Sequence, residues 1–173
     1  MKRSAGLVVY RQGKSGATEV LLVHPGGPFW SGKDEHAWSI PKGEYEDDDD
    51  AMETAMREFR EELGMDPPRP PWMSLGEVRQ PSRKVVTAWA VKGDLDIDDV
   101  RSNTFEMEWP RGSGRIAEFP EIDKASWFNL ATARTKLHKG QVQIVDRLIA
   151  GLKEQGERVN EGTSSTQQSL FDA

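Results

Sequence analysis

Hydrophobic residues in the first half of the chain fall into short runs. Residues 4–11 (SAGLVVYR) and 19–24 (EVLLVH) are rich in aliphatic side chains, and a turn containing glycine and serine separates them. Runs of this kind, bounded by turn residues, predict strands, and we expect these two to pair. Two further runs, at 75–79 and at 84–91 (KVVTAWAV), predict another pair of strands joined around Pro81.

The later part of the chain combines strand and helix patterns. At 105–109 apolar and acidic residues alternate, and a turn follows at 110–114, so we expect a strand within an insertion. Residues 121–128 (EIDKASWF) predict a last strand with its lead-in loop. Residues 129–138 and 141–153 predict two helices, the second with apolar residues at helical spacing.

The stretch 43–65 carries the strongest pattern of the chain. It contains apolar residues at the spacing of one amphipathic helix: Met52, Ala55, Met56, Phe59 and Leu63. The aspartates at 47–50 precede this helix and can cap its free N–H groups. Gly64, followed by Pro67 and Pro68, predicts its C-terminal end.

Strands, a central helix, more strands and two final helices predict an α/β protein. Its sheet should be mixed, with helices on both faces. A chain of 173 residues suits one domain with a tail. Because the composition becomes polar from residue 156, we expect one domain over 1–155 and a flexible tail over 156–173.

Composition excludes several classes of protein. The net charge of -6 argues against broad binding to nucleic acid or to an acidic membrane, and we expect neither as a partner. The chain contains no cysteine, which excludes disulfides and thiolate chemistry. No N-terminal apolar run resembles a signal peptide, and no apolar stretch is long enough to span a bilayer, so we expect a cytoplasmic location.

The predicted helix also carries an acidic face. Glu58, Glu61 and Glu62 lie at i, i+3 and i+4, so their carboxylates share one patch beside the apolar stripe. Hard divalent cations such as Mg²⁺ and Mn²⁺ take oxygen ligands and would offset the repulsion between these charges. Arg57 precedes the patch and can hold a carboxylate in a bidentate grip. The alternative is a solvated acidic face without a ligand.

The spacing of these residues resembles a known motif. Gly43, five residues, an acidic residue, seven residues and then REFREELGM at 57–65 are similar to the Nudix box, Gx5Ex7REUxEExGU with U apolar. One position departs, because the first glutamate of the family is Asp49 here. The resemblance covers roughly residues 5–153 and implies a Nudix-type α/β/α sandwich with a mixed sheet. It also implies hydrolysis of the pyrophosphate linkage in a nucleoside diphosphate joined to another group.

The resemblance implies a set of metal ligands. Glu58, Glu61 and Glu62 would hold Mg²⁺ or Mn²⁺, together with the backbone carbonyl of Lys42, which comes just before the box glycine. Bound metal would neutralise the pyrophosphate and lower the pKa of a water molecule. Gly64, at the predicted helix end, would support the site.

Other residues would direct the chemistry. Arg57 would orient Glu58, and Asp49, one methylene shorter than the glutamate of the family, would hold Arg57. Nudix enzymes often take a further carboxylate from a loop before a tryptophan such as the one at 127. Glu121 is the first candidate for that carboxylate and Glu118 the second. Either Glu58 or Glu121 could take the proton of the attacking water.

Candidate substrate contacts surround the box. Lys42 and Gly43 lie where phosphate would bind, Arg79 ends a predicted strand, and Trp38 could stack on a base together with the aromatic pair at 29–30. The alternatives are a solvated lysine, a solvated strand end and aromatic side chains that cover the core.

Several functions remain open. The run SIPKG at 39–43 is similar to the diadenosine-polyphosphate and diphosphoinositol branches and to some enzymes of oxidised nucleotides. A diadenosine polyphosphate or an (oxidised) nucleoside triphosphate is therefore favoured, with ADP-ribose or another nucleotide sugar as the alternative. Another alternative is a non-catalytic nucleotide-binding regulator. A further one is a repair accessory, because Gln167 to Phe171 (QQSLF) resemble the peptide with which bacterial repair proteins dock on the sliding clamp.

Overall fold

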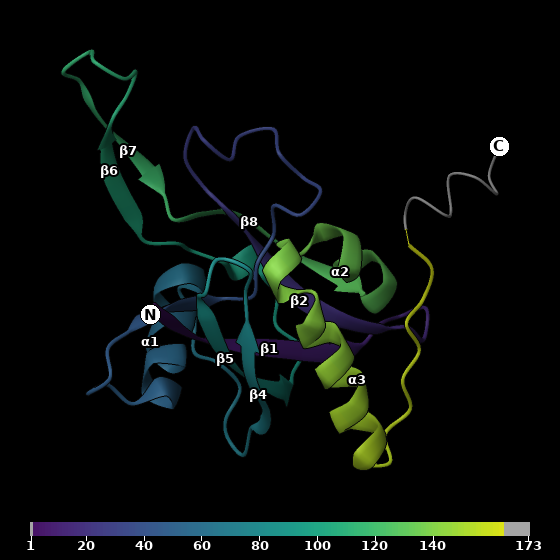
Figure 1. Cartoon of the computed structure of the whole chain (residues 1–173). Coiled ribbons are helices and arrows are strands. Elements are labelled where there is room, and N and C mark those ends of the chain that lie inside the picture. The colour runs from purple at the N-terminus through teal and green to yellow at the C-terminus, as the bar shows by residue number, and fades with distance from the viewer. Residues whose placement is uncertain (1, 165–173) are drawn as a thin grey trace, which may run out of the picture.

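A six-stranded mixed sheet forms the centre of the molecule in the computed structural model, which describes residues 2–164 (Figure 1). A separate two-stranded sheet contains β6 and β7. The strands are β1 (Arg3–Gln12), β2 (Thr18–Pro25), β3 (Lys42–Tyr45), β4 (Met73–Arg79), β5 (Val85–Lys92), β6 (Thr104–Glu108), β7 (Ile116–Pro120) and β8 (Ile122–Asn129). The helices are α1 (Ala51–Leu63), α2 (Leu130–Lys136) and α3 (Gln143–Glu154), with short 3-10 helices at Ile97–Asp99 and Lys139–Gln141.

Strand β1 is the centre of the main sheet. The order is β4-β5-β1-β2-β8, with β3 paired to the first part of β1. β1 runs parallel to β5 and antiparallel to β2 and β3. β1 is buried along most of its length, and helices cover both of its faces. This explains its continuous apolar run LVVY, in which successive side chains point to opposite faces.

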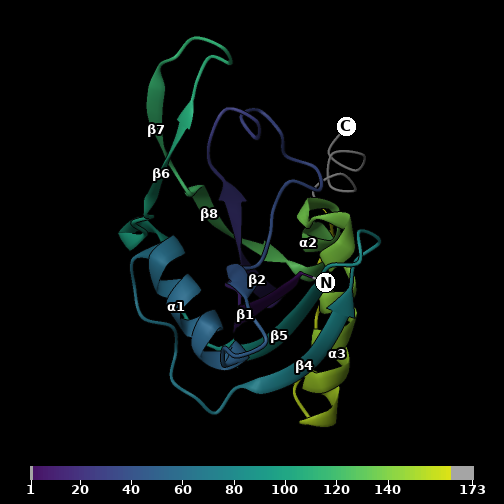
Figure 2. The ribbon, with the colours of Figure 1, turned by 60° about the vertical axis from the view of Figure 1, so that its left-hand side comes forward.

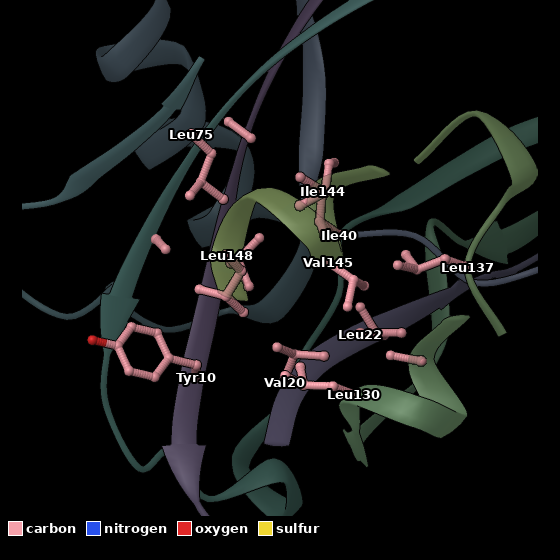
Figure 3. Close-up of a cluster of buried hydrophobic side chains, with 14 of the residues drawn as sticks. Tyr10, Val20, Leu22, Ile40, Leu75, Leu130, Leu137, Ile144, Val145 and Leu148 are labelled. Carbon is pink, nitrogen blue, oxygen red and sulfur yellow. The ribbon is translucent and has the colours of Figure 1, made fainter. Parts of the chain in front are cut away.

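Helices cover both faces of this sheet, as predicted. Leu7 and Val9 of β1 pack in one cluster with Phe59 of α1. The alternate residues Val8 and Tyr10 point to the opposite face, where α2 and α3 supply the apolar side chains of a second cluster (Figure 3). Full burial of an aliphatic or aromatic side chain of this kind contributes about 1.5–3 kcal/mol.

The ends of α1 follow the sequence prediction. Asp50 is the N-cap, and its side chain accepts a hydrogen bond from the backbone N–H of Glu53 at 2.9 Å. Gly64 ends the helix in the left-handed conformation, with φ 69°, and donates its N–H to the carbonyl of Arg60. These two caps fix the length of the helix that carries the glutamates.

Two strands were not predicted. β3 carries Lys42 and Glu44 and has no apolar alternation, so only its pairing with β1 makes it a strand. β7 pairs with β6, and the two form a hairpin that projects from one end of the molecule (Figures 1 and 2). The loop between β2 and β3 rises beside this hairpin in both views.

The segment expected to be a tail from residue 156 makes defined contacts up to residue 163. Thr18 and Ala131 donate their N–H groups to the carbonyls of Asn160 and Glu161. The side chain of Val159 packs against the core cluster of α2 and α3. Residues 157–163 thus form a polar strap that lies along the domain, and residues 165–173 of the expected tail lie outside the described residues.

We expect truncation after Glu154 to lower the melting temperature relative to a chain that ends at Ser164. The shorter chain loses the two backbone hydrogen bonds and the apolar contact of Val159. Each hydrogen bond contributes about 0.5–1.5 kcal/mol, and each kcal/mol shifts Tm by about 2–4 °C in a chain of this size, so the loss should be about 5–10 °C. Thermal unfolding followed by circular dichroism measures it; equal Tm values would show that the strap does not stabilise the domain.

Candidate active site

The acidic side of α1 faces the short strand β3. The apolar stripe of α1 packs against β1, and this packing brings Glu58 directly onto Gly43. A Cβ atom added at Gly43 would lie 2.0 Å from Cδ of Glu58. Any side chain at position 43 would therefore displace the carboxylate, so this glycine sets the position of Glu58.

Glu62 is the most perturbed carboxylate of the site. The backbone of Lys42 donates a hydrogen bond to it, while its buried Oε2 atom has no hydrogen-bond partner among the described residues. Burial raises the pKa of Glu62 to about 8, and the charges of Glu58 and Glu121 act in the same direction, against the ammonium of Lys42. This oxygen is available to a cation that enters the site.

Glu58 and Glu61 share a loose contact with Arg57. The Nη2 atom of Arg57 lies 3.7 Å from Oε1 of Glu58, and its Nε atom lies 3.9 Å from Oε1 of Glu61. Burial and the charge of Glu61 raise the pKa of Glu58, and Arg57 opposes them. Charge-assisted hydrogen bonds measure about 2.7–2.9 Å, so Arg57 holds neither carboxylate tightly.

The carboxylates do not yet converge on one point. Within residues 2–164, no three Asp, Glu or His groups are gathered as a metal-binding set. Glu61 faces Arg57, and a shared cation would have to draw its side chain away from that residue. Glu62 needs no such release, because Oε2 is already unpaired among the described groups.

Asp49 does not contact Arg57 as the sequence suggested. Its carboxylate accepts the N–H of Glu46 at 3.0 Å, and its own N–H bonds the carbonyl of Glu46. Among the ion pairs of the described residues, none joins Asp49 to Arg57. The shorter side chain thus closes the turn before α1, where a local backbone partner is nearer than the guanidinium.

Glu121 joins the carboxylates of α1, and Glu118 does not. Burial raises the pKa of Glu121, and so does the charge of Glu61. Glu62 and Glu121 line the same cavity, with a volume of about 520 Å³. Glu118 is exposed on the hairpin, opposite Glu106. The loop before β8 therefore brings its first candidate, and not its second, to the site.

A second cavity, of about 250 Å³, lies against β3, and its lining contains two lysines and one carboxylate, that of Glu44; we call it the cationic cavity. Lys42, Lys84 and His138 line it. Burial lowers the pKa of His138, and Lys42 and Lys84 lower it further, which favours the neutral ring. Nδ1 of His138 accepts the N–H of Gly140, so in that ring Nε2 carries the proton and can donate.

The aromatic candidates divide between core and surface. Trp38 is only 6% exposed; its ring packs edge-on against His24 and Phe128, and its Nε1 donates to Asp34. The edge of Trp38 still lines the cationic cavity. Phe29 and Trp30 are 44% and 37% exposed, and Trp30 lines both cavities.

Arg79 lies outside the cationic cavity. Its side chain is exposed and lines a neighbouring pocket with Arg83, and Gln80 separates the two spaces. Gln80 and Gln141, like His138, reach the cavity although sequence reasoning did not single them out. Gln141 is 1% exposed and accepts the N–H of Ile40, so it holds the loop segment that leads into β3 at Lys42. A single sequence gives no signal for such polar residues at element ends.

A family model for the NUDIX domain matches residues 1–148. The chain belongs to the Nudix family. It is thus a pyrophosphohydrolase of the class that acts on phosphoanhydride bonds, and Nudix hydrolases generally need divalent cations. No curated protein matches the chain in sequence.

Solved Nudix structures share this fold at low identity. An Ap4A hydrolase from C. elegans in a binary complex is 21% identical, with a TM-score of 0.60, over 87% of this chain and 98% of that chain. The NUDIX domain of Shewanella oneidensis NrtR complexed with ADP ribose is 17% identical, with a TM-score of 0.57, over 87% of each chain. A chain of the complex between the C-terminal domain of mouse MUTYH and human PCNA is 16% identical, with a TM-score of 0.57, over 94% of each chain. The structural similarity shows that the fold is the same, and the low sequence identity leaves the substrate open.

The residues of this Nudix site fit a divalent cation. The donor atoms are carboxylate oxygens, which hard cations prefer, and one of them is buried without a partner among the described residues. Glu58, Glu61 and Glu62 are the residues that would hold it. Among residues 2–164, none of the helices has the length and apolar character needed to cross a membrane.

We expect the metal-free protein to lose stability as the pH rises from about 4.5 to about 8. Over this range Glu62 loses its proton in the unfolded chain but keeps it in the folded one, so folding binds a proton and weakens as protons become scarce. The variant Glu62→Gln should reduce this loss and melt several degrees higher than the wild type at pH 8, but not at pH 4.5, while Glu58 and Glu121 keep a smaller loss of the same sign.

The matched control is Glu154→Gln, an exposed glutamate on α3. Thermal unfolding in chelator gives the pH profile, and added Mg²⁺ should raise Tm for the wild type more than for Glu62→Gln. A wild-type profile parallel to that of Glu62→Gln would show that the carboxylate of Glu62 is not held in the protonated form.

Proposed function

We propose that this Nudix protein is a metal-dependent hydrolase that cleaves the pyrophosphate linkage of a nucleoside-diphosphate-linked substrate. A diadenosine polyphosphate or an (oxidised) nucleoside triphosphate is the favoured substrate. One observation carries the proposal: a cavity with carboxylates and a cavity with lysines adjoin, and Pro25 and Trp30 line both. A polyphosphate chain needs cations along its length, and a base at its end needs a flat apolar surface.

The cationic cavity suits the phosphate chain. Lys42 and Lys84 supply positive charge in a protein whose net charge is -6, and His138 supplies a neutral N–H donor. The exposed ring of Trp30 borders this cavity and offers a stacking surface. Lys42 belongs to both parts of the site, because its backbone binds Glu62 while its side chain faces the cavity.

The carboxylates suit the bond-breaking step. A bound divalent cation would neutralise the pyrophosphate and lower the pKa of a water molecule, with Mg²⁺ or Mn²⁺ as the candidate ions. Glu58 and Glu121 both have raised pKa values, which favours proton acceptance near neutral pH. We propose these two as the candidates for the general base, with Arg57 as the residue that restrains Glu58.

Other functions have less support. An ADP-ribose or nucleotide-sugar substrate fits the same pair of cavities, and the product pattern decides between these classes. A non-catalytic regulator is disfavoured because Glu58, Glu61 and Glu62 are all present. The sliding-clamp peptide at 167–171 lies outside the described residues, so a repair accessory recruited by that segment stays a hypothesis.

We expect Glu61→Gln and Glu62→Gln each to lower kcat about 10–100-fold, as the loss of a charged metal ligand or its support does. The assay is a panel of diadenosine tetraphosphate, nucleoside triphosphates and ADP-ribose with Mg²⁺ or Mn²⁺, scored by the products formed. Glu154→Gln, with its exposed carboxylate on α3, is the control. Full turnover in both variants would overturn the metal assignment.

We expect Lys84→Ala to raise KM for the preferred nucleotide about tenfold and to change kcat little. Lys84 lines the cationic cavity, and one charge-assisted phosphate contact contributes about 1.5–3 kcal/mol. Lys92→Ala, at the exposed far end of β5, is the control. If the two variants had the same KM, the cavity would not be the phosphate site.

A further inference from the structure

The β6–β7 hairpin is an amphipathic sheet whose apolar face covers no core. Residues that lie directly opposite in the pair share a face, so Phe105 and Phe119 lie on one side and Glu106 and Glu118 on the other. Neither core cluster contains a residue of this hairpin. Instead, Phe105 and Met107 form a wall of the cavity that contains Glu62 and Glu121.

The loop after β2 forms the facing wall of this cavity. Phe29 and Trp30 line it, and both are exposed at the surface. The hairpin and the loop are tied together at their tips. Phe29 packs edge-on against Trp109 with 5.7 Å between ring centroids, and the guanidinium of Arg111 lies 5.0 Å from the centroid of Phe29. The result is a slot with aromatic walls and an acidic floor.

We propose that this slot holds the second base of a substrate that carries a base at each end of its polyphosphate chain, that is, a dinucleoside polyphosphate. The inference rests on the proposed function and goes further, because it names the substrate class and the residues that select it. The cationic cavity then receives one nucleotide, and the slot between the hairpin and the loop receives the other. The reacting phosphates lie between them, next to the carboxylates of α1.

The lining of the slot determines which part of a substrate it accepts. Apart from Glu62 and Glu121, the side chains that line it are apolar or aromatic, so they offer a contact surface to an uncharged base and no protein cation to a terminal phosphate. Aromatic side chains stack on every nucleobase, since each base has a flat π-face. The slot, at about 520 Å³, has twice the volume of the cationic cavity, at about 250 Å³, so a bulky end group fits it.

The backbone links the slot to the reacting groups. β7 leads directly into Glu121, whose N–H binds the carbonyl of Asn103 and whose carbonyl accepts the N–H of Gly26. Glu121 thus joins the base of the hairpin to the start of the loop. A base held between the two walls also holds this carboxylate in place, which couples recognition of the distant base to the position of a candidate general base.

The test compares diadenosine tetraphosphate with adenosine 5′-tetraphosphate, which has the same phosphate chain without the second adenosine. The wild type should have a lower KM for the first compound. Phe105→Ala and Phe29→Ala, one from each wall, should each raise that KM about tenfold, as the loss of one base–aromatic stack does. Both should leave the KM for adenosine tetraphosphate within about twofold of the wild type.

The control variant is Ile116→Ala. Ile116 is a 64% exposed apolar residue of the same hairpin and does not line the slot, so neither KM should change. Thermal unfolding checks that each variant is folded. A wild type that treats both compounds alike would overturn the proposal, as would equal rises in both KM values or no rise with either slot variant.

The outcome also separates this inference from the proposed function. If the wild type hydrolyses neither compound nor any other nucleotide of the substrate panel, the proposed function fails. Equilibrium binding of the two nucleotides in Ca²⁺, followed by tryptophan fluorescence, then tests the slot alone. Tighter binding of diadenosine tetraphosphate that Phe105→Ala removes supports the slot, and equal binding of both nucleotides overturns it.

Discussion

A carboxylate that is buried without a full set of partners costs free energy, and the packing of α1 on β3 keeps Glu62 in that state. The backbone of Lys42 binds this carboxylate, while Gly43, the next residue, leaves the space that Glu58 occupies. A divalent cation bound to this carboxylate would remove the cost. The apolar stripe of α1 thus has two roles. It packs in the core against β1, and this packing fixes how closely the glutamates of α1 lie to β3.

The positions of β1 and β2 determine where the other parts of the site lie. β3 pairs with the first part of β1, so Lys42 lies between the carboxylates and the cationic cavity. β2 ends at Pro25, and the loop that follows forms walls of both cavities. Carboxylates, cations and aromatic surfaces therefore meet at one end of the sheet, where loops can vary without disturbing the core.

The helix that carries the box was predictable because its signals are local. Asp50, Gly64 and the apolar stripe need no tertiary information, and the fold class followed from the order of the elements. Contacts across the fold were not predictable. Asp49 accepts a hydrogen bond from the backbone of its own turn and not from Arg57. β3 is a strand only because it pairs with β1. His138 lines the cationic cavity because α2, which precedes it, lies beside that cavity. Residues 157–163 have the polar composition of a flexible tail because they lie on the surface, although they form backbone hydrogen bonds to the domain.

The most direct measurement is a crystal structure of the protein soaked in Mn²⁺, with the ion located by its anomalous scattering. The account predicts a peak at coordination distance from the Oε2 atom of Glu62, with Glu58 or Glu61 as a further ligand and Arg57 turned away. Glu62→Gln crystals should lose that peak. Mn²⁺ bound elsewhere, or no ion at Glu62 while Arg57 still lies between Glu58 and Glu61, would contradict the account.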